Sequence, residues 1–316
     1  MVELNQTIAN KYRLDKFVGQ GAWAKIYRAT DISQNKSVAI KLLSEPDNSA
    51  RKEKEIERFF NEARTIATLH HPNIVDVFDY GLVDGEQAYF VMEYVAGSSL
   101  ATILDNGPLP LTRALSICVQ ICSALIAAHE KGILHRDIKP DNVVVSTDAT
   151  ECDTVKLLDF GMLKIIQSDM PVDSLTTTGV TVGTPGYMSP EQCLGKQLSP
   201  ASDIYSLGCL MYEALTGRTP FRGANPIEVL EKHMKLPPDK FDVVCPQREW
   251  PPGLEQVVLK TLEKDPRQRY QSAAPLKADL ERVIAGKPPN FGGLGAAIAA
   301  AAQKLFHGRC ANKRHS

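Results

Sequence analysis

The sequence has no basic excess, no long uninterrupted apolar run and no N-terminal leader pattern. Its 36 lysines and arginines are balanced by 37 acidic residues, for a formal net charge of −1, so nothing indicates binding to nucleic acid or an anionic membrane. No stretch reaches the roughly 18 consecutive apolar residues of a membrane-spanning helix, and residues 1–6 lack the basic start and apolar core of a signal peptide. We therefore expect a cytoplasmic protein with no nucleic-acid partner and no membrane span.

The seven cysteines form no paired framework. Cys118 and Cys122 fall one helical turn apart in an apolar segment, where core packing explains them better than a metal pair, and no histidine or cysteine follows at zinc spacing. Unpaired cysteines in apolar stretches indicate a reducing compartment. The chain has 316 residues, 43% hydrophobic and 23% charged, an ordinary globular composition that allows either two packed lobes or one large domain.

Two carboxylates follow short apolar segments in the middle of the chain. Residues 135–142 read His-Arg-Asp-Ile-Lys-Pro-Asp-Asn, and a predicted strand at 155–158 leads to Asp-Phe-Gly at 159–161. Asp137 could accept a proton from an attacking hydroxyl, while Asp159 and Asn142 could hold a hard divalent cation through oxygen. Either motif alone is compatible with a turn that satisfies its own backbone. The ordered set favours chemistry on a phosphate.

A turn with two glycines lies between the first two predicted strands. Residues 12–18 and 25–29 alternate in a β pattern and are joined by Gly-Gln-Gly-Ala-Trp-Ala at 19–24. Glycines let the backbone approach a ligand closely, and consecutive N–H groups can bind phosphate, although a plain hairpin has the same appearance. A Rossmann site would need a helix after the glycines, and a Walker loop would need Gly-Lys-Ser/Thr. Neither follows.

A lysine and a glutamate in neighbouring predicted elements are suited to pair. Lys41 lies on a third predicted strand among apolar residues, and a buried ammonium needs an acidic partner. In the predicted helix over 52–69, Glu62 shares a face with Phe59 and Ile66, which directs it inward.

Two weaker expectations concern the surrounding segments. The charged residues 45–58 indicate a mobile connection rather than a site. Strands are expected over 73–80 and 87–93, with a turn over 81–85.

As an ordered set, these motifs resemble those of the protein kinase family over residues 12–286. The resemblance implies a bilobal α+β fold, with a small β-rich N-lobe containing one main helix (12–92), a hinge (93–98) and a larger, mostly helical C-lobe (99–286). An N-terminal extension (1–11) and a C-terminal linker and tail (287–316), expected to be partly helical, flank it. ATP and Mg²⁺, which Mn²⁺ can replace, are the implied cofactors.

The resemblance also implies roles for individual residues. Asp137 would orient the accepting hydroxyl, Lys139 would offset charge on the transferred group, and Glu62 would hold Lys41 against the ATP phosphates. Asn142 and Asp159 would bind the metal. The remaining nucleotide-binding positions are Val18, Gly19, Gln20, Gly21, Ala22, Ala24, Ile26, Ala39, Met92, Glu93 and Val95.

The chain departs from the family pattern at Ala24, where a third glycine is usual, and at Ala96, where many relatives place an acidic residue near the ribose.

Residues 159–191 have no clear hydrophobic period, and a loop of this length is usually functional or disordered. It ends Gly-Thr-Pro-Gly-Tyr-Met-Ser-Pro-Glu-Gln at 183–192, which resembles the bacterial eukaryotic-like Ser/Thr kinases. In such relatives, threonines eight and six positions before the Gly-Thr threonine are autophosphorylated. Counting back from Thr184 gives Thr176 and Thr178.

Several residues have expected supporting roles. Arg136 is the natural cation for a phosphothreonine, because its guanidinium is always charged and bidentate. By resemblance, Glu191 pairs with Arg269, and Asp203 caps the backbone of the catalytic loop.

The sequence predicts ATP-dependent phosphotransfer to serine or threonine of proteins, including autophosphorylation, with a transient homodimer as an open question. A pseudokinase scaffold and a small-molecule phosphotransferase are the alternatives. The complete set Lys41, Glu62, Asp137, Asn142 and Asp159 argues against the first. The segment 183–192 argues against the second.

Overall fold

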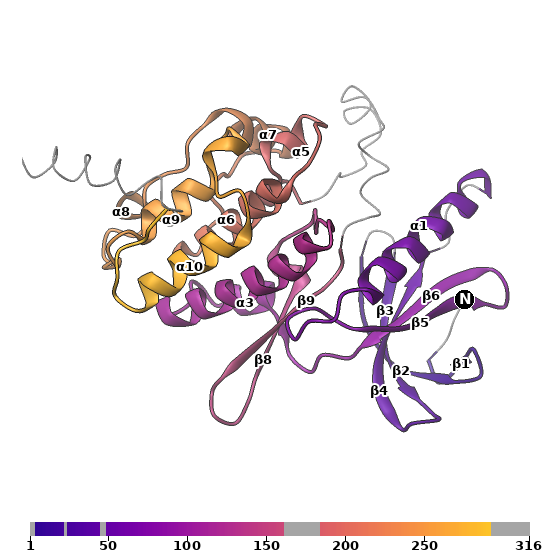
Figure 1. The fold of residues 1–316 in the computed structure, drawn as a ribbon. Coiled ribbons are helices and arrows are strands. Elements are labelled where there is room, and N and C mark those ends of the chain that lie inside the picture. Colours follow the sequence, from indigo (N-terminus) through magenta and orange to yellow (C-terminus); the bar gives the residue numbers. More distant parts are fainter. Residues whose placement is uncertain (1–3, 22–23, 45–48, 161–183, 292–316) are drawn as a thin grey trace, which may run out of the picture.

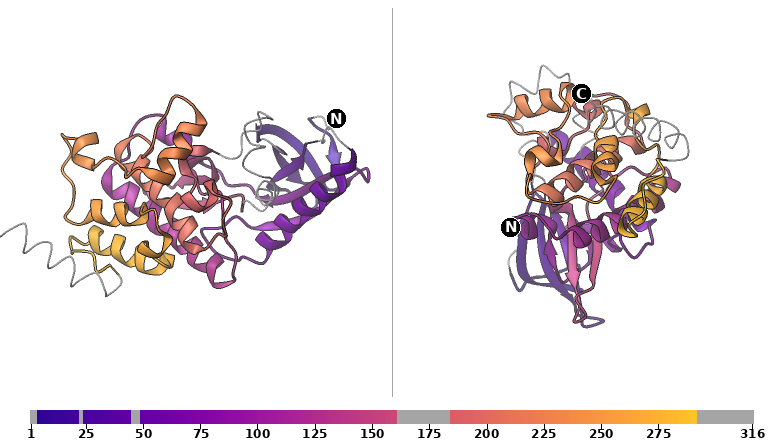
Figure 2. Two further views of the ribbon diagram at one scale, coloured as in Figure 1. Left: turned by 90° about the horizontal axis from the view of Figure 1, so that it is seen from above. Right: turned by 90° about the vertical axis from the view of Figure 1, so that its left-hand side faces the viewer.

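The computed structural model describes residues 4–21, 24–44, 49–160 and 184–291, and they form two lobes, one rich in strands and one mostly helical (Figure 1). The left-hand view of Figure 2 shows the two lobes at opposite ends of the molecule. The bilobal α+β prediction is confirmed.

The N-lobe elements are β1 (Thr7–Ile8), β2 (Tyr12–Gln20), β3 (Ala24–Asp31), β4 (Lys36–Leu43), α1 (Ser49–Ala67), β5 (Val77–Val83) and β6 (Gln87–Glu93). The strands form a six-stranded antiparallel sheet in the order β1-β2-β3-β4-β6-β5. Ile8 on β1 is buried, so residues 7–8, expected in an extension, complete the edge of this sheet.

The two faces of the N-lobe sheet are covered differently because side chains alternate along each strand. Leu14, Ala29 and Ile40 belong to one buried cluster on the outer side of the sheet. On the other side, α1 packs its apolar stripe onto β6, with the rings of Phe59 and Phe90 5.0 Å apart. This packing sets the position of Glu62, three residues after Phe59 on the same helix face.

Two expectations about the N-lobe were wrong. α1 begins at Ser49, inside the stretch expected to be a mobile connection. The charged residues over 53–58 are good helix formers, and Glu53, Lys54 and Glu57 among them are exposed. β5 spans Val77–Val83 instead of 73–80. Its turn comes at Asp84 and Gly85, both with positive φ, which are residue types that tolerate the left-handed conformation.

The C-lobe begins with β7 (Ser98–Ser99), α2 (Leu100–Leu104), α3 (Leu111–Glu130), the 3₁₀ turn η1 (Pro140–Asn142), β8 (Val143–Thr147) and β9 (Asp153–Leu157). After residue 183 follow η4 (Pro185–Tyr187), α5 (Pro190–Cys193), α6 (Pro200–Thr216), α7 (Pro226–Lys235), α8 (Phe241–Val244), α9 (Leu254–Thr261), η5 (Pro266–Gln268) and α10 (Ala273–Ile284). The strands β7, β8 and β9 form a small antiparallel sheet.

Helix α6 is the centre of the C-lobe, since all its residues except Pro200 and Glu213 are buried. At Gly208 it approaches the end of α9 so closely that a Cβ there would clash with Thr261 Oγ1. Among the described residues, α3 alone is long and apolar enough to cross a membrane. It packs between α10, β9 and α6, and its apolar side chains belong to the main core, which is the arrangement of a core helix.

The lobes are joined by backbone pairing as well as by the hinge. Val75 N–H donates to Leu157 O at 3.1 Å, and Leu157 N–H donates to Asn73 O at 2.9 Å. The Asn73 side chain extends this contact by donating to Val155 O at 2.9 Å. The segment after α1, which sequence reasoning assigned to a strand of the N-lobe, therefore pairs with β9 of the C-lobe. This contact places the end of β9 beneath the N-lobe sheet.

Candidate active site

Lys41 joins the two lobes through its ammonium group. Its Nζ lies 2.9 Å from Glu62 Oε1 on α1 and 2.8 Å from Asp159 Oδ1, just after β9. Burial opposes the charge of Lys41, but the carboxylates of Asp159 and Glu62 outweigh it, so the pKa of Lys41 is raised above its ordinary value. The expected pairing of Lys41 with Glu62 is present, and Lys41 is fully charged at neutral pH.

The segment from His135 to Asp137 is fixed by backbone hydrogen bonds to the carboxylate of Asp203 on α6. Asp203 Oδ2 accepts the His135 N–H at 2.9 Å, and Oδ1 accepts the Arg136 N–H at 2.8 Å. Arg136 has a φ of 65°, an uncommon conformation for a residue with a side chain. These two hydrogen bonds provide the expected cap and stabilise the turn that presents Asp137.

His135 links the two carboxylate-bearing segments. Burial lowers the pKa of His135, so the ring is neutral. Its Nε2 lies 2.8 Å from Leu158 O, and the Asp137 N–H lies 3.2 Å from its Nδ1. Because a neutral imidazole donates with one nitrogen and accepts with the other, the proton must be on Nε2. The ring also contacts buried Phe160, with centroids 4.6 Å apart.

Asp137 is surrounded by Asn142 and Lys139. Asn142 Nδ2 donates to Asp137 O at 2.8 Å and to Asp137 Oδ2 at 3.1 Å. Lys139 Nζ lies 3.7 Å from Asp137 Oδ2 and donates to Thr184 Oγ1 at 3.2 Å. The carboxylate of Asp137 is thus oriented by an amide and accompanied by a cation. Thr184, the first described residue after the gap, lies within reach of the same lysine.

Asn142 and Asp159 are brought together by one backbone bond, from Leu158 N–H to Asn142 O at 2.8 Å. The hydrogen bonds of Asn142 to Asp137 use its amide nitrogen, so the amide oxygen is the atom suited to a hard cation. Within the described ranges, no three His, Cys, Asp or Glu side chains could hold a metal together. Mg²⁺, however, takes only one or two carboxylates and completes its shell with water and substrate phosphates, so this donor pair fits it.

The proposed nucleotide-binding positions come from β2, β3, β4 and β6. Ala39 and Lys41, two residues apart on β4, share a face, and Met92 and Ile26 lie opposite them in register. Glu93 ends β6, and half-buried Val95 follows in the hinge.

The glycine turn lies at the end of β2, where Gly21 N–H donates to Ala24 O at 2.8 Å. A Cβ at Gly19 would meet no atom within 4 Å. Val18 and Gln20 are exposed on the same strand, whereas Ala22 lies outside the described residues.

The segment after residue 183 is anchored by a buried ion pair. Arg269 donates to both oxygens of Glu191, from Nη1 at 2.7 Å and from Nη2 at 2.9 Å. The expected pair is therefore bidentate. Thr176 and Thr178 lie outside the described residues, and the role of Arg136 toward them stays a prediction. Arg136 Nε is buried and has no hydrogen-bond partner among the residues that the structure describes.

Sequence reasoning did not find His129, whose Nε2 lies 2.8 Å from Asp203 Oδ2. It also missed the hydroxyl of Tyr187, which donates to Glu213 at 2.5 Å. The partners are 74 and 26 residues apart, so no local spacing connects them. Only the packing of α3 and η4 against α6 could have indicated these contacts.

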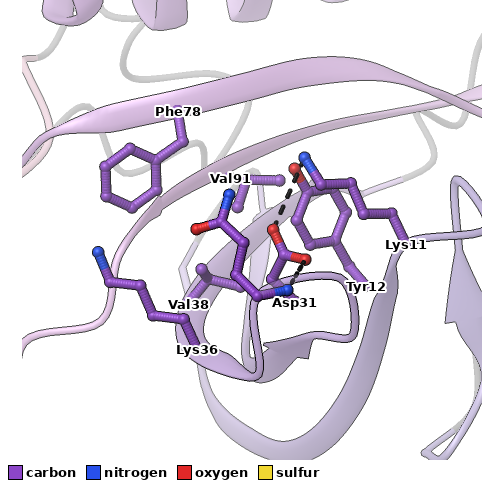
Figure 3. A pocket seen from close by; sticks show the side chains of 8 residues that line it. Lys11, Tyr12, Asp31, Lys36, Val38, Phe78 and Val91 are labelled. Carbon is purple, nitrogen blue, oxygen red and sulfur yellow. Dashed lines mark hydrogen bonds and ion pairs between the residues drawn. The ribbon is translucent and has the colours of Figure 1, made fainter.

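A cavity on the outer face of the N-lobe sheet is separate from this site (Figure 3). Its volume is about 180 Å³, below the roughly 300 Å³ at which ligand pockets begin. Lys11 lies 3.6 Å from Asp31 within it, and the Tyr12 hydroxyl donates to Asp79 at 2.9 Å. We assign no nucleotide to this cavity, because it is smaller than a ligand pocket and separate from the Lys41–Asp159 site.

Comparison with known proteins identifies the family. The protein kinase domain profile matches residues 12–279. The chain is 38% identical to the serine/threonine-protein kinase pkn3 of Myxococcus xanthus and 39% identical to PknB of Mycobacterium leprae. Each alignment covers 89% of this chain, but only 51% and 44% of those proteins. The chain thus spans about half the length of the curated relatives it matches.

Solved structures agree on the fold. The kinase domain of Mycobacterium tuberculosis PknI superposes with a TM-score of 0.69 at 24% identity, covering 90% of this chain and 99% of that one. Rad53 1–466 in complex with AMP-PNP gives 0.68 at 28% identity over 86% and 66% of the two chains. The Lys41–Glu62–Asp159 and Asp137–Asn142 contacts agree with this fold, and the profile match over residues 12–279 shows that the chain belongs to the protein kinase family.

Proposed function

We propose that the chain transfers the γ-phosphate of ATP to serine and threonine side chains of proteins. The observation that carries the proposal is the assembled site: Lys41 contacts both Glu62 and Asp159, while Asn142 and Lys139 surround Asp137. A pseudokinase scaffold would not need all of these side chains, and no observation favours one. The relatives named as serine/threonine-protein kinases support the same substrate class.

The substrate hydroxyl would lie beside Asp137, which orients it and accepts its proton as the oxygen attacks the γ-phosphorus. The bond from that phosphorus to the bridging oxygen breaks, and ADP leaves. Lys139, with Nζ 3.7 Å from that carboxylate, offsets negative charge on the transferred group. Lys41 contacts the non-transferred phosphates of ATP and is held for this purpose by Glu62. Phosphoryl transfer depends mainly on positioning and electrostatics, which is what these contacts provide.

The metal would be held by Asn142 and Asp159. When bound, Mg²⁺, or Mn²⁺ in its place, neutralises phosphate charge and orients the chain of phosphates. The contact between Asp159 and Lys41 would then loosen, so that Asp159 binds the metal and Lys41 binds the nucleotide. The adenine would lie against Ala39 and Met92, with its polar edge on the backbone of Glu93 and Val95. Val18, Gly19, Gln20, Gly21, Ala22, Ala24 and Ile26 would cover the phosphates and ribose.

We further propose that Thr176 and Thr178 are autophosphorylated and that Arg136 binds the resulting phosphate. Its buried Nε, which has no partner within the described part of the chain, supports this, because a buried guanidinium nitrogen requires an acceptor. Phosphorylation of one copy by another requires a transient homodimer. ATP and Mg²⁺ are plentiful in the cytoplasm, where we place this part of the protein.

The decisive experiment measures transfer of radiolabelled phosphate from ATP to a serine- and threonine-containing protein and to the chain itself. Wild type should transfer label to serine and threonine, and chelation of divalent cations should stop it. Asp137→Asn should lose about 10²–10⁴-fold in rate while still binding ATP. Equal rates for the two proteins would remove Asp137 from the mechanism, and no transfer by wild type that binds ATP would indicate a pseudokinase.

A further inference from the structure

A lysine outside the motifs connects the hinge to β9. Lys156 Nζ lies 2.7 Å from Glu93 Oε2 and donates to Ile74 O at 3.2 Å. Glu93 is the last residue of β6 and the first of the hinge, whereas Ile74 belongs to the segment that follows α1. One side chain of the C-lobe thus contacts both connections between the lobes.

The position of Lys156 follows from the alternation of β9. Val155 and Leu157 are buried, so the side chain between them points to the opposite face of the strand. The Lys156 side chain is 13% exposed and that of Glu93 30%. Water screens an ion pair of this kind only partly, so the contact retains more of its attraction than one on the open surface.

The surroundings of the pair limit how Glu93 can move. Its backbone N–H donates to Asp76 O at 2.9 Å, and residues 73–75 are paired with Leu157 on β9. The backbone of Glu93 is therefore tied to the segment after α1, and its side chain to β9. Two residues beyond β9 comes Asp159, which contacts Lys41 in the same structure. The Lys156–Glu93 contact is therefore present together with the Lys41–Asp159 contact of the candidate active site.

We infer that Lys156 is a positioning residue for nucleotide binding, holding the backbone of Glu93 at a set distance from Asp159. This rests on the proposed function, because adenine would bind the hinge at Glu93 while the phosphates extend toward Asp159. A nucleotide that contacts both Glu93 and Asp159 binds best when the distance between these residues is already set. Binding then costs no free energy to fix that distance. Asp137 lies in the C-lobe and does not depend on this contact. The Lys156–Glu93 pair therefore affects nucleotide affinity more than turnover.

The test compares Lys156→Met, Glu93→Gln, the double variant and Lys156→Arg. Methionine keeps the apolar stem and removes the charge, while arginine keeps the charge. Lys156→Met and Glu93→Gln should each raise the KM for ATP and the Kd for ADP with Mg²⁺ by about 3- to 10-fold, with kcat within about twofold of wild type. The double variant should resemble either single variant, because both remove the same contact. Lys156→Arg should stay within about threefold of wild type.

Lys277→Met, which removes a half-buried lysine of α10 3.8 Å from Glu281, is the matched control and should leave KM and Kd unchanged. Unchanged ADP affinity in Lys156→Met, effects that multiply in the double variant, or a fall in kcat at constant KM would each overturn the inference. If Lys156→Met does not fold, Lys156→Gln replaces it, with a thermal melt as the check. ADP affinity needs no turnover, so a wild type that binds ADP and loses affinity in the variants but transfers no phosphate would reject only the proposed function.

Discussion

Lys41 and Asp159 are 118 residues apart in the sequence, yet Nζ and Oδ1 lie 2.8 Å apart. The contact exists because β4 places Lys41 on the face of the N-lobe sheet that meets the C-lobe, and because β9 ends directly beneath it. Glu62 approaches the same ammonium from α1. Helix α1, the N-lobe sheet and the C-lobe therefore meet at the Nζ atom of Lys41. Variants near this atom should show how the three depend on one another.

Replacing Glu62 by glutamine should lower kcat/KM by roughly 10- to 100-fold, because a hydrogen bond to a charged group contributes about 1.5–3 kcal/mol. Lys41 would then turn toward Asp159 alone. Steady-state phosphotransfer measures the loss. Glu57→Gln, an exposed position on the same helix, is the control and should leave the rate within about twofold. A Glu62 variant as active as this control would contradict the expected role.

Replacing Thr176 and Thr178 together by alanine should reduce activity by roughly 10- to 100-fold, on the order expected from charge-assisted bonds to one phosphate. Phosphatase treatment should bring wild type to the level of the variant, since both lack the phosphate that Arg136 would bind. Mass spectrometry of active wild type should find phosphate on both threonines. Full activity of the unmodified protein would refute the prediction.

Breaking the pair between Arg269 and Glu191 should destabilise the C-lobe. Arg269 is 3% exposed and also donates to the carbonyls of Glu263, Ala201 and Lys264. Arg269→Met leaves a buried carboxylate unpaired and should lower the free energy of unfolding by about 3–5 kcal/mol, measured by urea denaturation. Arg267→Met removes an exposed pair with Asp265 and should cost much less, because solvent screens an exposed ion pair. Equal losses would show that burial does not govern the Arg269 contact.

His233 on α7 should make the protein less stable in mild acid. It is fully buried, with its Nδ1 3.0 Å from the Tyr205 hydroxyl and its ring 4.7 Å from that of Phe221. Burial, and then the nearby charge of Lys264, lowers the pKa of His233 to about 3. The unfolded chain takes up a proton near pH 6.5 whereas the folded chain does not, so this contribution to stability is present above pH 6.5. It is lost as pH falls toward 3, by about 1.4 kcal/mol for each pH unit.

Unfolding of wild type and His233→Asn between pH 4.5 and 7.5 tests this. Asparagine keeps an acceptor for Tyr205 but does not titrate, so its stability should fall less steeply below pH 6.5. His70→Asn, at an exposed side chain, should follow wild type. Parallel pH curves for wild type and His233→Asn would exclude the histidine as the cause.

The sequence by itself determined the elements whose signals are local. Alternation predicted β2, β3 and β4, helical spacing predicted most of α1, and the offsets of Glu62 from Phe59 and Ile66 predicted its inward direction. These patterns are readable because a strand or helix turns its residues to defined faces whatever it packs against. The order of the motifs also indicated the family, and with it the pairing of Glu191 with Arg269.

The tertiary structure alone decided which polar groups meet across elements. Nothing near Lys156 indicates Glu93, and nothing near His129 indicates Asp203, because those contacts arise when β9 and α3 pack against neighbours far away in the chain. The same holds for residues 73–75, whose apolar character fits a strand of the N-lobe but whose backbone pairs with β9 of the C-lobe. A sequence indicates which face of a helix or strand is buried. The packing of the two lobes alone determines which residues that face contacts.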